Sequence, residues 1–279
     1  MRSLKEWHHT LGWHPVAGFK LALVILGCLL IILPQTLVIR FATRHANILP
    51  RWWSRQVARI VGARVRVHGR PAGGAALYVS NHISWLDIPV IGGRTPGAFI
   101  AKSEVAGWSG VGTMARLYRC VFVNRSRPRD SANQRNELKE RFEAGDGLIL
   151  FAEGTSTDGT AVRPFKSTLF AVADALPDMT VQPVTIAYTR INGIPIGRAR
   201  RPLIGWYGDM ELTSHIWELL KLGRIDVEIR FHAPIRPADC AGRKDLAARA
   251  HAAVAHGLVR AHAGLPHEES AARPLTDQR

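Results

Sequence analysis

The sequence predicts an α/β fold with a mostly parallel central sheet flanked by helices, preceded by an N-terminal membrane-associated helical segment. From about residue 62, short β-rich runs alternate with helical patterns, which is typical of parallel strands joined by helices. A long apolar stretch stands before the first of these runs. We therefore expect a membrane anchor and interfacial segment over residues 1–60, a globular domain over 61–262 and a solvated tail over 263–279.

The apolar stretch covers residues 21–39 and is interrupted by Pro-Gln-Thr at 34–36. It barely reaches the roughly 20 residues needed to cross a bilayer, and the interruption would kink or turn a helix. A transmembrane span and a half-inserted hairpin are therefore both open, with a cleaved signal sequence and a buried core helix as further alternatives. No small-residue cleavage site follows, and the arginines after it, with Trp52 and Trp53, suit a membrane interface.

The globular part should contain seven strands and four main helices. We expect strands over 61–67, 77–80, 98–101, 120–123, 148–151, 181–188 and 227–231. Helices are expected over 131–143, 164–175, 211–222 and 243–261. Pro183 lies inside one apolar run, which predicts an edge strand or a bulge there.

The composition indicates a folded protein with an anionic partner. Lys and Arg number 37 against 22 Asp and Glu, a net charge of +15, and 47% of the residues are hydrophobic. This excludes a disordered chain. The arginines are spread along the chain without a nucleic-acid-binding motif, so membrane lipids are expected as partners and nucleic acid is not. The three scattered cysteines and the histidines show no metal-site spacing, so no metal and no cofactor are expected.

The strongest chemical pattern follows the run 77–80, where the sequence reads NHISWLD. On a regular helix His82 and Asp87 would lie about 140° apart, so they can meet only if His82 precedes the helix. A carboxylate bound to one imidazole nitrogen fixes the tautomer and leaves the other nitrogen as a base. The structural alternative is that Asp87 caps a helix, with Ser84 in a capping box, and that His82 is an ordinary loop residue.

Two later strand ends also carry polar residues. Glu153 and Gly154 follow the run 148–151, and Arg125 follows the run 120–123. A glycine lets the backbone approach a ligand closely, and a glutamate can accept hydrogen bonds from a substrate. A guanidinium suits phosphate or carboxylate. Such strand ends are where α/β folds place their functional groups.

In this order and at these spacings, the motifs resemble the glycerolipid acyltransferase superfamily, typified by bacterial lysophosphatidic acid acyltransferases. The resemblance covers about residues 60 to 235, including an apolar Val-x-Pro-Val block at 181–184. It implies that His82 and Asp87 are the catalytic pair. The residues expected at the substrate are Asn81, Arg125, Glu153, Gly154, Thr155 and Lys166.

Two departures from the family pattern concern the acceptor headgroup. Ser156 stands where an arginine is usual, and Arg119 stands where a glycine is usual. The first departure weakens the case for a phosphate-bearing acceptor unless Arg119, Arg163 or Lys166 supplies the charge. The run from Glu153 through Lys166 resembles the branch that acylates lyso-ornithine lipid, a zwitterionic acceptor without phosphate.

The resemblance implies a membrane-bound O-acyltransferase that uses acyl carrier protein or CoA thioesters as co-substrates. The free hydroxyl of a lysophospholipid, foremost 1-acyl-sn-glycerol-3-phosphate in phospholipid biosynthesis, is the expected acceptor. Lyso-ornithine lipid is the alternative acceptor, and a non-catalytic membrane lipid-binding protein is the alternative of another class. The expected location is the bacterial inner membrane, with the catalytic domain on the cytoplasmic side.

Overall fold

The computed structural model describes residues 14–123, 131–174, 176 and 178–267. Its strands are β1 (Ala63–His68), β2 (Ala76–Ser80), β3 (Gly97–Lys102), β4 (Val121–Val123), β5 (Gly147–Phe151), β6 (Thr180–Ile191), β7 (Ile194–Pro195) and β8 (Ile225–Phe231). Its α-helices are α1 (Pro15–Phe41), α2 (Ile48–Val61), α3 (Asp87–Gly92), α4 (Val111–Leu117), α5 (Ser131–Glu143), α6 (Leu212–Lys221) and α7 (Arg243–His262). Short 3₁₀ segments include η5 (Ser167–Asp174) and η6 (Arg198–Leu203).

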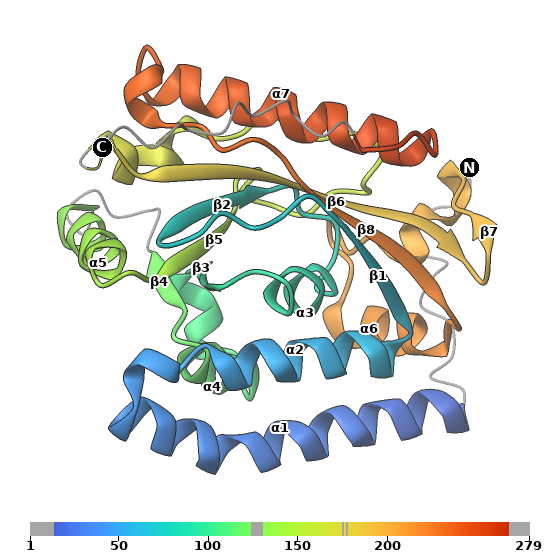
Figure 1. The fold of residues 1–279 in the computed structure, drawn as a ribbon. Helices are drawn as coiled ribbons and strands as arrows, with labels where there is room; N and C mark the ends of the chain where they lie inside the picture. Colours follow the sequence, from blue (N-terminus) through green and yellow to red (C-terminus); the bar gives the residue numbers. More distant parts are fainter. Residues whose placement is uncertain (1–13, 124–130, 175, 177, 268–279) are drawn as a thin grey trace.

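The strands form one eight-stranded sheet in the order β1-β8-β6-β2-β5-β3-β4, with β7 paired to β6. The pairs β2–β5, β2–β6, β3–β5, β3–β4 and β1–β8 are parallel, whereas β6–β8 and β6–β7 are antiparallel. The predicted fold class, a mostly parallel sheet flanked by helices, is therefore confirmed (Figure 1).

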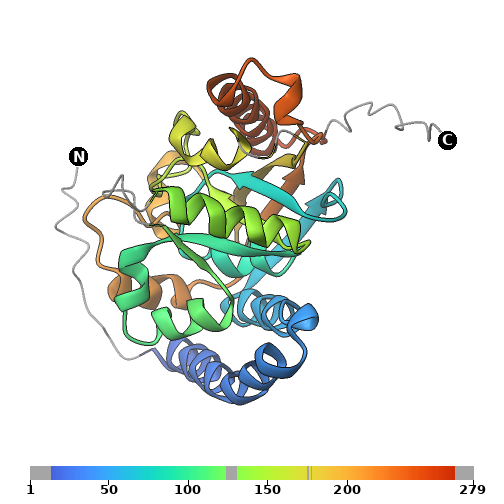
Figure 2. The same ribbon diagram turned by 90° about the vertical axis from the view of Figure 1, so that its left-hand side faces the viewer.

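Helices cover both faces of the sheet because side chains along each strand alternate between two hydrophobic clusters. In β2, Tyr78 packs into the cluster shared with α1, α2, α3 and α6, whereas Leu77 and Val79 pack into the cluster shared with α5, η5 and α7. Figures 1 and 2 show the resulting layers, with α7 on one side of the sheet and α2 and α1 on the other. A sheet buried on both faces explains the continuous apolar strand runs.

Several expected boundaries differ from the structure. The helix expected over 164–175 is the 3₁₀ segment η5, and neither α2 nor α4 was among the expected helices. The first strand begins at Ala63 because α2 extends to Val61 and ends at Gly62, whose φ of 109° favours glycine. The expected tail begins as packed chain, since the Leu265 carbonyl accepts a hydrogen bond from Arg230. Residues 268–279 lie outside the described residues.

Pro183 lies in β6, an inner strand between β2 and β8, so the expected edge position is wrong. The expected bulge does lie opposite it. Val184 pairs with Phe231 and Val181 with Ile235, so the segment opposite β6 contains one residue more than β6 does between these two pairs. Irregular pairing at this point tolerates a residue that has no N–H to donate.

The N-terminal segment forms a helical hairpin. Helix α1 continues through Pro34 to Phe41, so the alternative of a turn at 34–36 is wrong, and the chain reverses only after α1, before α2 begins. Instead of turning the chain, Gln35 donates hydrogen bonds from Nε2 to the carbonyls of Ala46 and Leu117. At the other end of α1, Lys20 Nζ donates to backbone carbonyls at the C-terminal ends of α2 and α6.

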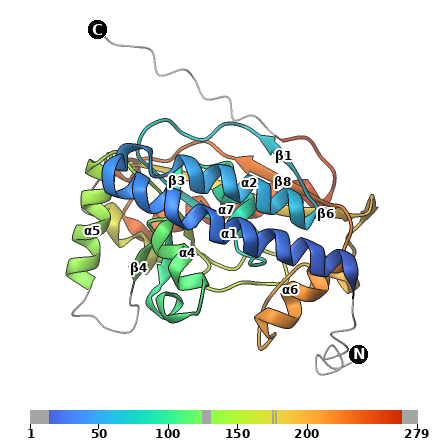
Figure 3. The ribbon, with the colours of Figure 1, turned by 90° about the horizontal axis from the view of Figure 1, so that it is seen from below.

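One face of α1 packs on the domain and the other is open. Figure 3 shows α1 lying along α2, α4 and α6. Of the 18-residue stretch of α1 with the highest hydropathy, only 11% is buried, which contradicts the buried core-helix alternative. The exposed apolar side chains of α1 are Val16, Phe19, Leu23, Ile25, Leu26, Leu29, Leu30, Leu33, Leu37 and Phe41. Such a long exposed apolar stripe indicates membrane association.

Candidate active site

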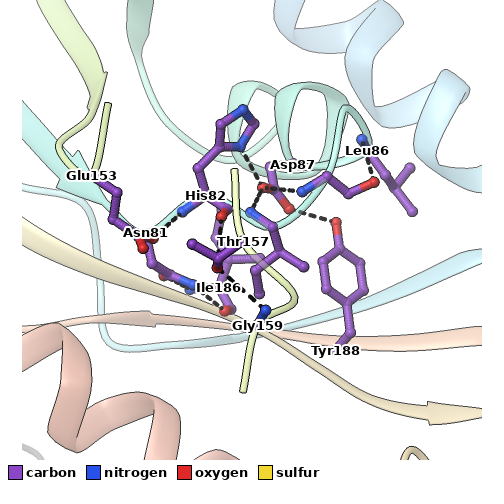
Figure 4. Close-up of polar contacts among 11 residues, drawn as sticks. Asn81, His82, Leu86, Asp87, Glu153, Thr157, Gly159, Ile186 and Tyr188 are labelled. Carbon is purple, nitrogen blue, oxygen red and sulfur yellow. Dashed lines mark hydrogen bonds and ion pairs between the residues drawn. The ribbon is translucent and has the colours of Figure 1, made fainter. Parts of the chain in front are cut away.

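The candidate site lies where β2 ends and α3 begins. His82 is in the loop and Asp87 is the first residue of α3, which is the arrangement that their spacing requires for contact. His82 Nδ1 lies 2.8 Å from Asp87 Oδ2 (Figure 4). The Asp87 carboxylate is fully buried, whereas the His82 side chain keeps 17% of its surface exposed. The predicted contact between the two residues is confirmed.

Asp87 also organises the loop around it. Its Oδ2 accepts hydrogen bonds from the backbone N–H groups of Ile83 and Ser84, at 2.6 and 2.9 Å. Its Oδ1 accepts a hydrogen bond from the Tyr188 hydroxyl at 2.7 Å. The bond from the Ser84 N–H is one half of the expected capping box, but no side chain caps the first turn of α3, so the structural alternative is met only in part. A carboxylate at Nδ1 favours the tautomer whose hydrogen is on that atom.

The orientation of the imidazole is fixed by stacking. The ring centroids of His82 and Phe151 are 4.0 Å apart and the rings are inclined by 11°, and Phe151 in turn stacks on Phe99 at 5.9 Å. No hydrogen bond joins His82 Nε2 to any other residue that the structure describes. This nitrogen is therefore the atom on which a proton could be exchanged with a ligand.

The backbone of the loop is held from several strands. The Asn81 side chain donates to the Ile186 carbonyl and accepts from the Ile186 N–H, each at 2.9 Å. The His82 carbonyl accepts from the Thr157 N–H at 2.9 Å. Asn81 is 1% exposed, so these contacts give it a role in holding β2 to β6 and leave no amide atom for a substrate.

Glu153 braces the same loop. Its Oε1 accepts from the His82 N–H at 2.7 Å and its Oε2 accepts from the Arg163 N–H at 2.8 Å. Burial raises the pKa of Glu153 to about 7, while these two backbone hydrogen bonds act in the opposite direction. Both carboxylate oxygens of Glu153 therefore bind backbone N–H groups of the protein. The expected contact of Glu153 with a substrate is not supported by this arrangement.

The remaining expected residues are spread around the end of β5. Gly154 has a φ of 74°, a left-handed conformation that suits the sharp turn there. Thr155 is exposed, as is Lys166, whose N–H donates to the Ala152 carbonyl at 3.0 Å. Arg125 lies outside the described residues. Thr155 and Lys166 are thus open to solvent beside the end of β5.

Arg119 is not part of this site. Its guanidinium pairs with Asp146 at 3.0 Å, and both residues lie just before the amino ends of β4 and β5, across the sheet from His82. The suggestion that Arg119 supplies charge to an acceptor is therefore wrong. Its φ of 56° is left-handed, which explains why the family pattern favours glycine here.

Sequence reasoning missed Tyr188, Phe151 and Thr157 as parts of the site. The neighbours of each residue in the sequence do not indicate a functional role, because its contact partner lies far away along the chain. Among the described residues no group of His, Cys, Asp and Glu side chains could hold a metal ion.

Known proteins resemble this chain in sequence and in fold. Residues 64–187 match the family model described as Acyltransferase. The chain is 44% identical to a lyso-ornithine lipid O-acyltransferase of Brucella abortus, over 76% of this chain and 82% of the relative. It is 36% identical to a lyso-ornithine lipid O-acyltransferase of Rhizobium meliloti, over 85% of this chain and 83% of that relative. The crystal structure of the 1-acyl-sn-glycerophosphate acyltransferase PlsC from Thermotoga maritima has the same fold, with a TM-score of 0.63 and 22% identity. The match covers 88% of this chain and 98% of that one.

Proposed function

This chain belongs to the acyltransferase family, and from that premise we propose that it moves a fatty acyl chain from a soluble acyl thioester to the free hydroxyl of a membrane lysolipid. The contact between His82 Nδ1 and Asp87 Oδ2 carries the proposal. It engages Nδ1 of the imidazole and leaves Nε2 to accept a proton. A non-catalytic lipid-binding protein would have no need of this pair.

The chemistry requires one base that later acts as an acid. His82 Nε2 takes the proton of the acceptor hydroxyl, and the oxygen attacks the thioester carbonyl. The tetrahedral intermediate collapses, the new ester forms, and the leaving thiolate receives the proton back from Nε2. Asp87 stabilises the imidazolium between these steps. Donor candidates are acyl carrier protein and CoA thioesters, and no cofactor takes part.

We propose a lyso-ornithine lipid as the acceptor. The sequence alone put the phosphate-bearing acceptor first, but the similarity to lyso-ornithine lipid O-acyltransferases favours the alternative. Ser156 in place of the usual arginine is consistent with an acceptor that lacks phosphate. A specific observation keeps 1-acyl-sn-glycerol-3-phosphate as the second candidate: Lys166 and Arg163 are exposed cations beside the β5 end.

We infer that α1 lies in one leaflet and does not cross the bilayer. Lys20 and Gln35 fasten the two ends of α1 to the domain, so the helix cannot stand upright without taking the domain along. An upright α1 would carry Arg55 and Arg59 of the adjacent α2 into hydrocarbon, which costs several kcal/mol per charge. Free Cys28, Cys120 and Cys240 fit the proposed cytoplasmic side, where thiols stay reduced and soluble acyl thioesters are made.

The acceptor and donor can be settled in one assay. Detergent-purified protein is offered radiolabelled acyl-CoA or acyl carrier protein together with lyso-ornithine lipid, lysophosphatidic acid or lysophosphatidylcholine, and the products are separated. We expect acylated ornithine lipid as the main product and none from the His82→Ala variant. Acylation of lysophosphatidic acid alone would establish the second candidate, and no product from any pair would overturn the proposed activity.

A further inference from the structure

Trp85, between His82 and Asp87 in the loop, is fastened to a helix outside the site. Its indole N–H donates a hydrogen bond to Nδ1 of His215, at 3.1 Å. His215 is on α6 and is 8% exposed, whereas Trp85 is half-buried, so this contact is partly shielded from water. An indole N–H that loses its acceptor inside the protein is left unsatisfied, so the pairing restrains both partners.

His215 can accept this hydrogen bond only while it is neutral. Burial lowers the pKa of His215 to about 4, although the backbone of Gly205 and Pro202 and the carboxylate of Glu218 act in the opposite direction. At neutral pH the ring is therefore uncharged and Nδ1 is an acceptor for Trp85. The same loop is also bound to the segment before α6, since the backbone N–H of Trp206 donates to the Ile83 carbonyl at 2.9 Å.

The other end of α6 is tied to the apolar helix α1. Lys20 Nζ donates to the Leu220 carbonyl at 3.1 Å and to the Leu222 carbonyl at 2.8 Å, where α6 ends. Figure 3 shows α6 beside α1. Helix α6 therefore connects the loop that holds His82 with the helix whose outer face is apolar.

We propose that His215 is a positioning residue of the active site, which holds Trp85 and thereby fixes the loop His82–Asp87 relative to α1. This rests on the proposed function, because the lysolipid hydroxyl must reach His82 from the surface in which α1 lies. A misplacement of about 1 Å in a reacting group can lower a rate by about 100-fold. The effect should therefore appear in kcat, while substrate contacts and KM stay unchanged.

A matched pair of substitutions tests the hydrogen bond. His215→Leu removes the acceptor, whereas His215→Asn retains an oxygen close to the position of Nδ1. We expect His215→Leu to lower kcat by at least about 10-fold with KM changed by less than about 2-fold, and His215→Asn to restore most of the loss. Trp85→Phe should lower kcat similarly, and adding His215→Leu to it should cause little further loss, because the two residues act as one unit.

A second measurement does not depend on turnover. Amide hydrogen exchange over residues 82–91 should be faster in His215→Leu than in the wild type and unchanged in His215→Asn, with α7 as the internal control. If the wild type acylates no lysolipid, the proposed function fails, and exchange still decides the role of His215. Wild-type kcat and wild-type exchange in His215→Leu would overturn the inference, as would an Asn variant as impaired as the Leu variant.

Discussion

The Tyr188 hydroxyl lies 2.7 Å from Asp87 Oδ1, the carboxylate oxygen that His82 does not use. Tyr188 is in β6 and Asp87 begins α3, so the bond joins the sheet to the loop that carries His82 (Figure 4). Burial and the nearby Asp87 raise the pKa of Tyr188 well above its usual range, so the hydroxyl stays a donor. Both oxygens of the Asp87 carboxylate beside His82 therefore accept hydrogen bonds, which keeps the carboxylate in place.

Tyr188→Phe should destabilise the fold by about 2 kcal/mol, because Asp87 Oδ1 would be left buried without a donor. We expect a smaller loss of kcat than in His82→Ala, because His82 keeps its contact with Oδ2. Denaturant unfolding and steady-state kinetics measure the two effects. Tyr207→Phe, which removes a hydroxyl away from Asp87, is the matched control, and equal stabilities for the two variants would contradict the argument.

His82→Ala should lower kcat by about 10²- to 10⁴-fold, the usual contribution of a general base. The fold should survive, because the loop remains fastened through Asn81, Glu153 and Asp87. Circular dichroism and product formation from labelled donor check both statements. Wild-type turnover in a folded variant would remove His82 from the mechanism.

Glu153 should make stability depend on pH. Its folded-state pKa of about 7 exceeds the ordinary pKa of 4.5, so the folded state binds more protons between these values and stability falls as pH rises through that window. In the Glu153→Gln variant, the side chain at position 153 has no proton to gain or lose in this range. The stability difference between wild type and variant should therefore shift in favour of the variant by up to about 3 kcal/mol from pH 4.5 to pH 8. Unfolding curves across this range test it, and a constant difference would show that Glu153 stays ionised.

Arg119→Gly should leave KM for the acceptor unchanged, because Arg119 pairs with Asp146 at the opposite edge of the sheet. Glycine also relieves about 1 kcal/mol of left-handed backbone strain, which offsets part of the lost ion pair. Lys166→Ala serves as the comparison, since Lys166 is exposed near the end of β5. A rise in KM for Arg119→Gly that exceeds the rise for Lys166→Ala would reverse this assignment.

Replacing both Leu30 and Leu33 with Glu should release the protein from lipid vesicles. Each side chain is 67% exposed on the outer face of α1, and its burial in lipid stabilises binding by about 1.5–3 kcal/mol. Val259→Glu, on α7 across the sheet and 66% exposed, is the matched control and should still sediment with vesicles. Co-sedimentation of the doubly substituted protein at the wild-type level would contradict the one-leaflet placement of α1.

The sequence by itself determined the sheet class, most of the strands and the contact between His82 and Asp87. Apolar runs that alternate with helical patterns carry local information about strands, and the five-residue spacing places His82 in the loop before α3. The motif order also pointed to the family. Local patterns failed where the backbone departs from its regular form, as at η5, or where a buried polar side chain such as Gln35 donates to distant carbonyls.

Only the tertiary structure decided which of the polar residues face a ligand. Glu153 and Asn81 looked like substrate contacts, yet their side chains hold the loop through backbone groups of other strands. Tyr188 and His215 had no signal, because hydrogen bonds across 101 and 130 residues of chain leave no trace in local composition. The placement of α1 along the domain likewise depends on Lys20, whose carbonyl acceptors come together only when α2 and α6 end side by side.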